Sequence, residues 1–216
     1  ATLDVFGEVV DAYTMTESVT DEITVRIVYE GRAAKVLLDN SKLKEIEDYY
    51  ARCADDGASN YAIEESKRAN LQMTAILGDP DRLKALAADF VHHYDARIEE
   101  GATVAGKAMF VSSNRQIAYD FYKEVIDLRP EWAEVKACAD GEKLTEQEKK
   151  QIMPMERIKL VMTRGQDDEP ALYDMLGSKD YRKELDRQFK TSKSNFKIAI
   201  VVDMWLTGFD VPFLDS

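Results

Sequence analysis

The stretch KIAIVVDMWLTGFD, residues 197–210, begins as a nearly unbroken apolar run and ends as a polar turn. A short continuous apolar run is typical of a strand that is covered on both faces, as strands are in a parallel sheet. Two earlier runs have the same character, KAMFVS at 107–112 and IKLVMT at 158–163. We therefore expect three buried strands, the last of them at 197–203.

Amphipathic segments separate these three runs. Residues 115–126 have one apolar helical face, and residues 179–189 carry apolar side chains four positions apart. The apolar face of the first segment consists of Ile117, Phe121 and Val125. Shorter helices are predicted from Pro170 and from the capping box at 145–148. Strands that alternate with helices predict an α/β fold, with a parallel sheet flanked by helices and right-handed crossovers.

The first hundred residues differ from this pattern. ITVRIVYE, residues 23–30, alternates and predicts a strand with one buried face, and EVVDAYTM, residues 8–15, is a candidate for another. From Ser41 the apolar spacing becomes helical, and Asp79 followed by Pro80 predicts a new helix start. This last helix has an apolar stripe of Leu83, Leu86, Phe90, Val91, Tyr94 and Ile98, of which we expect Leu83, Phe90, Tyr94 and Ile98 to face inward.

These patterns divide the chain into a β lead-in at 1–40, a helical connector at 41–100 and an α/β domain at 101–216. With 216 residues and 45% hydrophobic residues, the chain is long enough for one large core, or one domain and an appendage. It has no initiator Met, so we expect a piece of a longer protein. We expect no signal peptide and no membrane segment, because no basic leader and no apolar run of about 20 residues occurs.

The net charge and the cysteines bear on the kind of protein and on its location. The net charge of −12 argues against a general nucleic-acid coat protein, because an acidic surface repels phosphates, so any nucleic-acid contact must be local. Cys53 and Cys138 are far apart and form no CxxC pair, which predicts free thiols and a cytoplasmic location.

Polar turns follow each of the three predicted strands, at Ser112–Arg115, Thr163–Gln166 and Asp203–Asp210. In open parallel sheets function gathers at the carboxyl ends of the strands. Hydroxyls, amides, Gly and Arg at these turns suit a phosphate backbone, so we include Thr163 among the candidate contacts. The alternative is that these groups only cap helices, in a non-catalytic α/β interaction module.

Other kinds of site find little support in the sequence. Adjacent histidines point about 100° apart on a helix, so His92 and His93 do not form a two-ligand face, and we expect no metal site. The sequence contains no GxxxxGK[ST] loop for ATP phosphates and no GxSxG nucleophile. The acidic run at 167–169 is interpreted as solvated loop.

The string DMWLTGFD, residues 203–210, resembles motif V of superfamily 2 helicase-like motors, and more specifically the R (motor and endonuclease) subunit of type I restriction enzymes. GKAMFVSSNRQIAYDFY, residues 106–122, is similar to motif IV of that family, and residues 6–32 resemble its passage after motif III. The resemblance implies the end of a first motor domain at 1–40 and an incomplete second RecA-like domain at 101–216. The wording of motif V favours this family over other superfamily 2 DNA or RNA helicases.

The resemblance also implies roles for individual residues. Thr207 and Gly208 would contact the DNA backbone, and Asp210 would lie toward the cleft that closes on ATP. A second DNA-contact set is implied at Ser112, Ser113 and Asn114. Trp205 and Phe209 are expected to pack within the turn rather than stack on bases.

The cofactors and partners implied by the resemblance are ATP and Mg²⁺ in the full-length protein, duplex DNA, and the modification (M) and specificity (S) subunits. The nucleotide-binding and nuclease motifs of the family lie outside this piece. We therefore expect no cofactor bound to the piece, no catalytic residue within it, and no ATPase or nuclease activity from the piece alone.

Overall fold

The computed structural model describes residues 12–24, 74, 76–101, 103, 105–139, 141–206, 208–211 and 213–214. They fall within two units, 1–33 and 34–216, which are described separately. Most of the predicted strand at 23–30, the helical segment at 41–73, Cys53 and Thr207 lie outside the described residues.

In the first unit, the described residues 12–24 include one short helix, α2 (Met15–Thr20). Thr14 and Glu17 form a capping box, in which the Glu17 amide donates to Thr14 Oγ1 (3.2 Å) and the Thr14 amide donates to Glu17 Oε2 (2.7 Å). The strand predicted at 8–15 is therefore wrong at its end, where the chain is irregular before the helix begins. Reciprocal capping satisfies two backbone donors locally and favours a helix start at this point.

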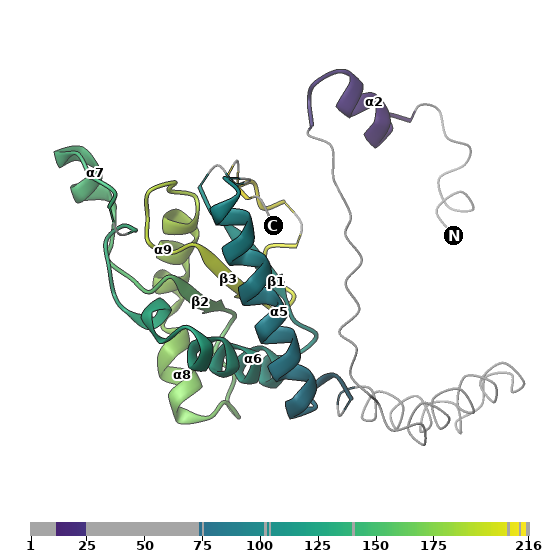
Figure 1. Ribbon diagram of the computed structural model, residues 1–216, viewed down its shortest axis with the longest axis vertical. Coiled ribbons are helices and arrows are strands. Elements are labelled where there is room, and N and C mark those ends of the chain that lie inside the picture. The colour runs from purple at the N-terminus through teal and green to yellow at the C-terminus, as the bar shows by residue number, and fades with distance from the viewer. Residues whose placement is uncertain are drawn as a thin grey trace, which may run out of the picture. The chain divides into compact units, whose positions relative to one another are not determined.

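The second unit is built on a parallel sheet of β1 (Ala108–Val111), β2 (Ile158–Val161) and β3 (Ile198–Val201). The strand order is β1-β3-β2, so β3 is central and pairs in parallel with both neighbours (Figure 1). The predicted α/β class, the parallel sheet and all three strands are confirmed. Each strand is shorter than its apolar run, and Thr163 and Asp203 lie beyond the strand ends.

Helices flank this sheet, as predicted. They are α5 (Pro80–Glu99), α6 (Arg115–Leu128), α7 (Glu146–Gln151), α8 (Pro170–Leu176) and α9 (Lys179–Phe189), with a 3₁₀ turn η1 (Pro130–Ala133). Side-chain caps fix several of the predicted starts: Asp79 accepts from the amide of Arg82, and Ser178 accepts from that of Tyr181. Such caps satisfy amides that have no partner within the helix.

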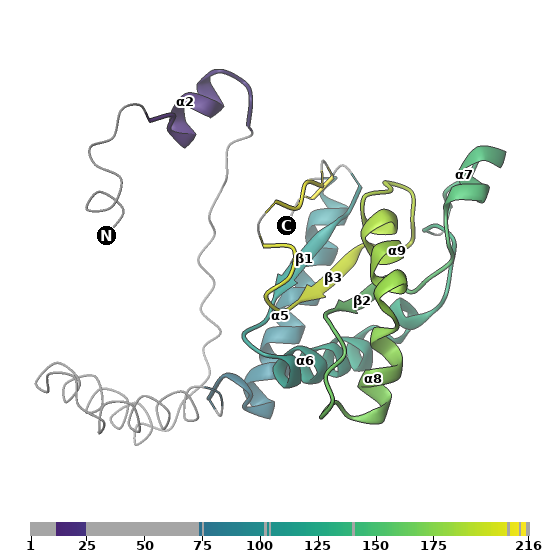
Figure 2. The same ribbon diagram turned by 180° about the vertical axis from the view of Figure 1, so that it is seen from behind.

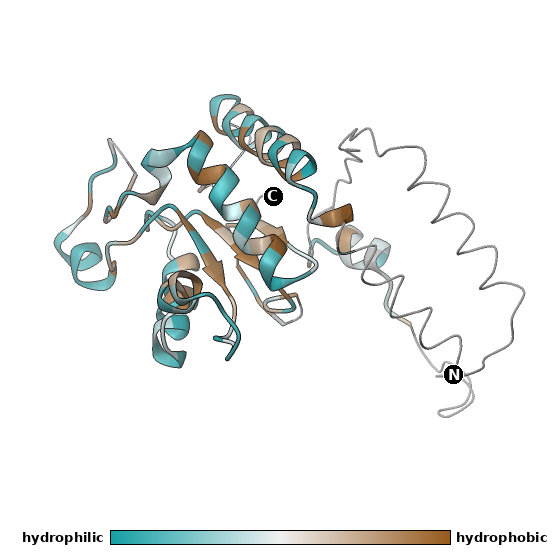
Figure 3. Ribbon diagram, turned by 90° about the horizontal axis from the view of Figure 1, so that it is seen from below, coloured by the Kyte–Doolittle hydropathy of each residue, from teal (hydrophilic) through white to brown (hydrophobic). Residues whose placement is uncertain are grey.

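The two faces of the sheet pack against different layers. Ile198 and Ile200 of β3 join the cluster formed with α5, α6 and α8, whereas Ala199 and Val201 join the cluster on the α9 side. Figures 1 and 2 show α5 and α6 over one face and α9 over the other. The strands are correspondingly hydrophobic between the amphipathic helices (Figure 3). Burial on both faces explains why the strands carry unbroken apolar runs.

The apolar stripe of α5 faces this core along most of its length. Leu83, Val91 and Tyr94 are buried, and Phe90 packs edge-on against Phe110 of β1 at 5.8 Å between ring centroids. The expectation that Ile98 faces inward is wrong, because its side chain is 44% exposed. Ile98 belongs to the last turn of α5.

A buried lysine joins α9 to the sheet. Lys107, just before β1, is fully buried, and its side-chain nitrogen Nζ donates to the carbonyl of Phe196 and, at 3.4 Å, to that of Gln188. The nitrogen also lies 5.3 Å from the centre of the Phe189 ring. Burial lowers the pKa of Lys107 from 10.5 to about 6, with a further contribution from the charge of Lys197.

Within the described ranges, no helix is both long enough and apolar enough to cross a bilayer.

Candidate nucleic-acid interface

The three polar turns predicted from the sequence lie at one edge of the sheet. Val111 of β1 and Val161 of β2 are both paired in register with Val201 of β3. Because the strands are parallel and in register, all three end at the same level. The turns after them therefore leave the sheet along a common edge, where an open parallel sheet commonly places its ligands.

The turn after β1 presents one predicted contact and uses two others for local structure. Ser113 is exposed. The Ser112 side chain is only 7% exposed, and its hydroxyl donates to the carbonyl of Asn114 at 3.2 Å. Asn114 is the N-cap of α6, and its Oδ1 accepts from the amide of Ile117 at 2.9 Å. Of this set, Ser113 is therefore the side chain that is free to meet a phosphate.

The turn after β2 presents Thr163 and Arg164, both exposed. Arg164 lies against α8, where its guanidinium carbon is 4.2 Å from the centre of the Tyr173 ring and its Nε donates to the Tyr173 carbonyl at 2.8 Å. A cation held on an aromatic face keeps its other donors available.

An ion pair joins the turns after β1 and β2. Arg115, the first residue of α6, donates from Nε to Asp168 Oδ1 at 3.1 Å and from Nη2 to Asp168 Oδ2. The Asp168 side chain is 6% exposed, so the expectation of a solvated loop at 167–169 is wrong for this residue. Hydrogen bonding from Arg115 holds the pKa of Asp168 below its usual range, although desolvation opposes this, and the Gly165 amide adds to the lowering.

The turn after β3 contains the candidate backbone contact. Gly208 is exposed and has a φ of 67°, and a Cβ atom built on it would meet nothing within 4 Å. An L-residue is strained in this conformation, and glycine also lets a phosphate approach the backbone closely. Asp210 is exposed. Thr207 lies outside the described residues, so its role remains a prediction.

Aromatic packing fixes the position of this turn. Trp205 and Phe209 stack at 4.1 Å between centroids with an interplanar angle of 9°, and Trp205 stacks in turn on Phe189 of α9 at 5.4 Å. Phe189 is fully buried, and the two turn residues are half-buried against it. Both aromatic residues therefore pack in the turn, as expected, and the stack anchors the residues on either side of Gly208.

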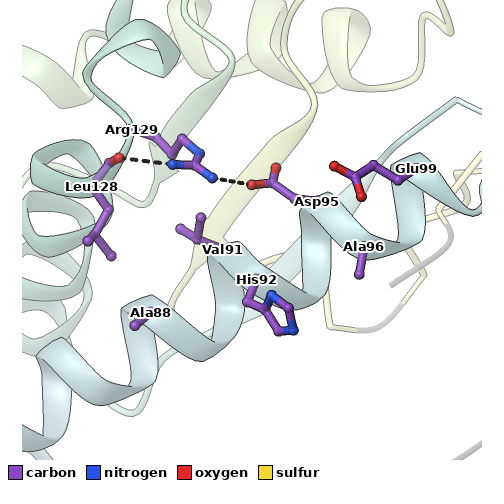
Figure 4. A pocket seen from close by; sticks show the side chains of 8 residues that line it. All are labelled: Ala88, Val91, His92, Asp95, Ala96, Glu99, Leu128 and Arg129. Atoms are coloured by element: carbon purple, nitrogen blue, oxygen red, sulfur yellow. Dashed lines mark hydrogen bonds and ion pairs between the residues drawn. The ribbon is translucent and has the colours of Figure 1, made fainter.

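A cavity of about 360 Å³ lies elsewhere, between α5 and the end of α6. Figure 4 shows Arg129 there, bonded to Asp95 and to the carbonyl of Leu128. None of the predicted site residues lines this cavity. Among the described residues no cluster of three His, Cys, Asp or Glu side chains could hold a metal ion.

Sequence reasoning placed Arg115 in the turn after β1 but missed Asp168 and the ion pair between them. The one local signal was that the first turn of α6 carries a cation and no acid, an arrangement that the helix dipole disfavours. That pattern indicates a carboxylate from elsewhere in the chain but cannot say which one.

Comparison with known proteins covers nearly the whole chain. Residues 104–216 match the family model of type I restriction enzyme subunit R domain 3, and residues 1–60 match that of the SWI2/SNF2 ATPase. The chain is 37% identical, over 98% of its length, to the type I restriction enzyme HindI endonuclease subunit of Haemophilus influenzae. It is 28% identical, over its full length, to a protein of Methanocaldococcus jannaschii named "Putative type I restriction enzyme MjaIXP endonuclease subunit".

The chain spans only 17% and 18% of the length of these two relatives. No solved structure matches it. The parallel sheet flanked by helices is consistent with part of a RecA-like domain, and the domain 3 match includes all three strands and the turns that follow them. On this evidence the chain belongs to the family of type I restriction enzyme R (endonuclease) subunits.

Proposed function

We propose that this chain is part of the ATP-dependent DNA translocase and endonuclease subunit of a type I restriction-modification system. Its role would be to hold the backbone of duplex DNA at the carboxyl edge of the sheet, through Ser113, Thr163 and the turn at Thr207–Gly208. Contacts to phosphates and sugars position a protein without reading sequence, as a translocating motor requires.

One observation carries this proposal. Three parallel strands end in register, so turns from three separate parts of the chain meet at one edge, in a chain of this family. Helix capping accounts for Asn114 and a local hydrogen bond accounts for Ser112. Neither accounts for the exposed Ser113 and Thr163, or for an exposed glycine with positive φ on a turn fixed by aromatic residues. The two relatives are named as type I restriction enzyme endonuclease subunits, which favours the restriction family over another superfamily 2 helicase.

The cofactors and partners follow from the same proposal. ATP and Mg²⁺ would bind in the full-length protein through residues outside this piece, and Asp210 would couple the turn to that nucleotide cleft. The M and S subunits would be its partners, the S subunit would read the DNA recognition site, and the assembly would act in the cytoplasm. The piece alone would neither hydrolyse ATP nor cut DNA, and DNA-stimulated ATPase activity in a clean preparation of it would contradict this.

The test of the DNA contact is a pair of substitutions at Gly208 in the full-length protein. Gly208→Asn keeps a residue that tolerates positive φ, whereas Gly208→Ala adds backbone strain of about 1–2 kcal/mol. If a phosphate approaches the backbone here, both side chains obstruct it. Both variants should then need more duplex DNA for half-maximal ATPase stimulation.

The two Gly208 variants distinguish a role in the shape of the turn from a role in contact with DNA. If Gly208→Asn behaves as wild type and only Gly208→Ala is impaired, the glycine serves the turn alone, and the proposed backbone contact is wrong. Ser113→Ala and Thr163→Val provide a second check, because each removes one exposed hydroxyl at the same edge. Circular dichroism melting confirms that each variant is folded.

A further inference from the structure

We propose that Arg115 and Asp168 form a positioning pair, which holds the turn after β2 in a fixed shape beside the turn after β1. Both turns can then contact the same DNA backbone. The inference rests on the proposed function of this edge. Neither residue touches the DNA itself. They act through Ser113 on one side and Thr163 on the other.

The pair has the geometry of a rigid connection. Two guanidinium nitrogens of Arg115, Nε and Nη2, donate to the two oxygens of Asp168, and the two residues are 53 positions apart in the chain. A two-point contact between planar groups fixes orientation as well as distance. The side chain of Asp168 is 6% exposed and that of Arg115 is 33% exposed, so water screens the pair only in part.

The same carboxylate also sets the shape of the turn after β2. The amide of Gly165 donates to Asp168 Oδ2 at 2.6 Å, which closes the turn between these two residues. A Cβ atom on Gly165 would lie 3.1 Å from Asp168 Oδ1 and 3.4 Å from Arg115 Nη2. The backbone beside Thr163 and Arg164 is therefore packed directly onto the ion pair.

The charges argue that Arg115 is not itself the phosphate ligand. Its guanidinium is already bonded at two points to a carboxylate, and the negative charge of Asp168 disfavours a phosphate beside the same cation. The cation also stands in the first turn of α6, where it is unfavourable unless an anion lies beside it, and that turn contains no acid of its own. Asp168 supplies that anion from the other turn.

The two possible roles predict opposite signs for one substitution. Asp168→Asn is nearly isosteric and removes a negative charge beside the proposed DNA path. If Arg115 contacts phosphate, this change frees it and tightens DNA binding. If the pair positions the turn, losing the charged contact weakens DNA binding despite the better electrostatics.

The experiment uses the full-length R subunit assembled with its partner subunits, at one fixed salt concentration. The duplex DNA concentration for half-maximal ATPase stimulation is measured for Arg115→Ala, Asp168→Asn and the double variant. We expect each single variant to raise this DNA concentration by about tenfold, as for a lost charge-assisted hydrogen bond. The maximal ATPase rate should be retained. The double variant should be no worse than the singles, because they break the same contact.

Asp95→Asn is the matched control. It removes the same charge from another arginine–aspartate pair, with Arg129, beside the cavity between α5 and α6. This variant should leave the DNA requirement unchanged. Arg115→Lys, which keeps the charge but not the two-point contact, should fall between wild type and Arg115→Ala.

Several results would overturn the inference. Tighter binding in Asp168→Asn would make Arg115 a phosphate ligand. Wild-type behaviour in both singles, with Gly208→Asn impaired, would leave the proposed function standing and reduce the pair to a structural contact. If Gly208→Asn, Ser113→Ala and Thr163→Val are also unaffected, the edge does not bind DNA and both proposals fail.

Discussion

Replacing Lys107 with Met should change how the stability of this chain depends on pH. Lys107 is fully buried, and burial lowers its pKa from 10.5 to about 6. Between these two values the unfolded chain binds a proton that the folded chain does not. The contribution of Lys107 therefore favours folding least at low pH, and folding becomes more favourable as the pH rises toward 10.5.

The size of the effect follows from linkage. Each pH unit in this window changes the free energy of unfolding by about 1.4 kcal/mol per group. At pH 7 the cost of keeping the amine neutral amounts to about 5 kcal/mol. Removing the amine leaves the carbonyls of Phe196 and Gln188 without this donor, at about 1–3 kcal/mol each, so the absolute stability of Lys107→Met combines opposing terms. The slope with pH is the sharper observable.

The assay is urea unfolding of this chain at several pH values from 7 to 9, followed by circular dichroism. We expect the wild type to gain stability relative to Lys107→Met by about 1.4 kcal/mol for each pH unit. Lys84→Met, at an exposed position of α5, is the control for losing one positive charge. Parallel pH profiles for wild type and Lys107→Met would refute the reasoning, because they would mean that the buried nitrogen stays protonated in the fold.

Two further predictions concern the structures that support the edge. Trp205→Ala should lower the free energy of unfolding by about 2 kcal/mol, since it removes a half-buried ring stacked on Phe189 and Phe209, and Trp205→Phe should retain part of this. An unchanged urea midpoint in Trp205→Ala would show that the stack does not hold the turn. Asn114→Ala should cost about 1 kcal/mol as the lost cap of α6, whereas Asn114→Asp should keep the cap. Equal losses in both would contradict the capping role.

Features encoded by neighbouring residues could be predicted from the sequence. The starts of α5 and α6 follow from apolar spacing with a nearby cap, and both are set by contacts within about one helical turn. The three strands were evident because burial on both faces leaves a continuous apolar run. A parallel sheet has the carboxyl ends of its strands at one edge, and this was enough to predict Ser113 and Thr163 there.

Features that depend on distant residues could not be predicted. The acid at 168 looks like its exposed neighbours in sequence, and only the folded chain brings it to Arg115. Lys107 stands at the start of an apolar run with no local sign that its nitrogen would be enclosed. The error at the end of the predicted strand 8–15 is of another kind, because the capping box of Thr14 and Glu17 starts a helix at Met15.

The stacked turn after β3 also gives the chain an internal optical probe. The chain has two tryptophans, Trp132 and Trp205. Trp132 is buried and packs edge-on against Tyr94, at 5.2 Å between ring centroids. In a Trp132→Phe background the remaining indole is Trp205, three residues before Gly208 and in face-to-face contact with Phe209. Its emission would report the movement of this turn directly, so the proposed binding of DNA at the edge could be tested in real time without an attached dye.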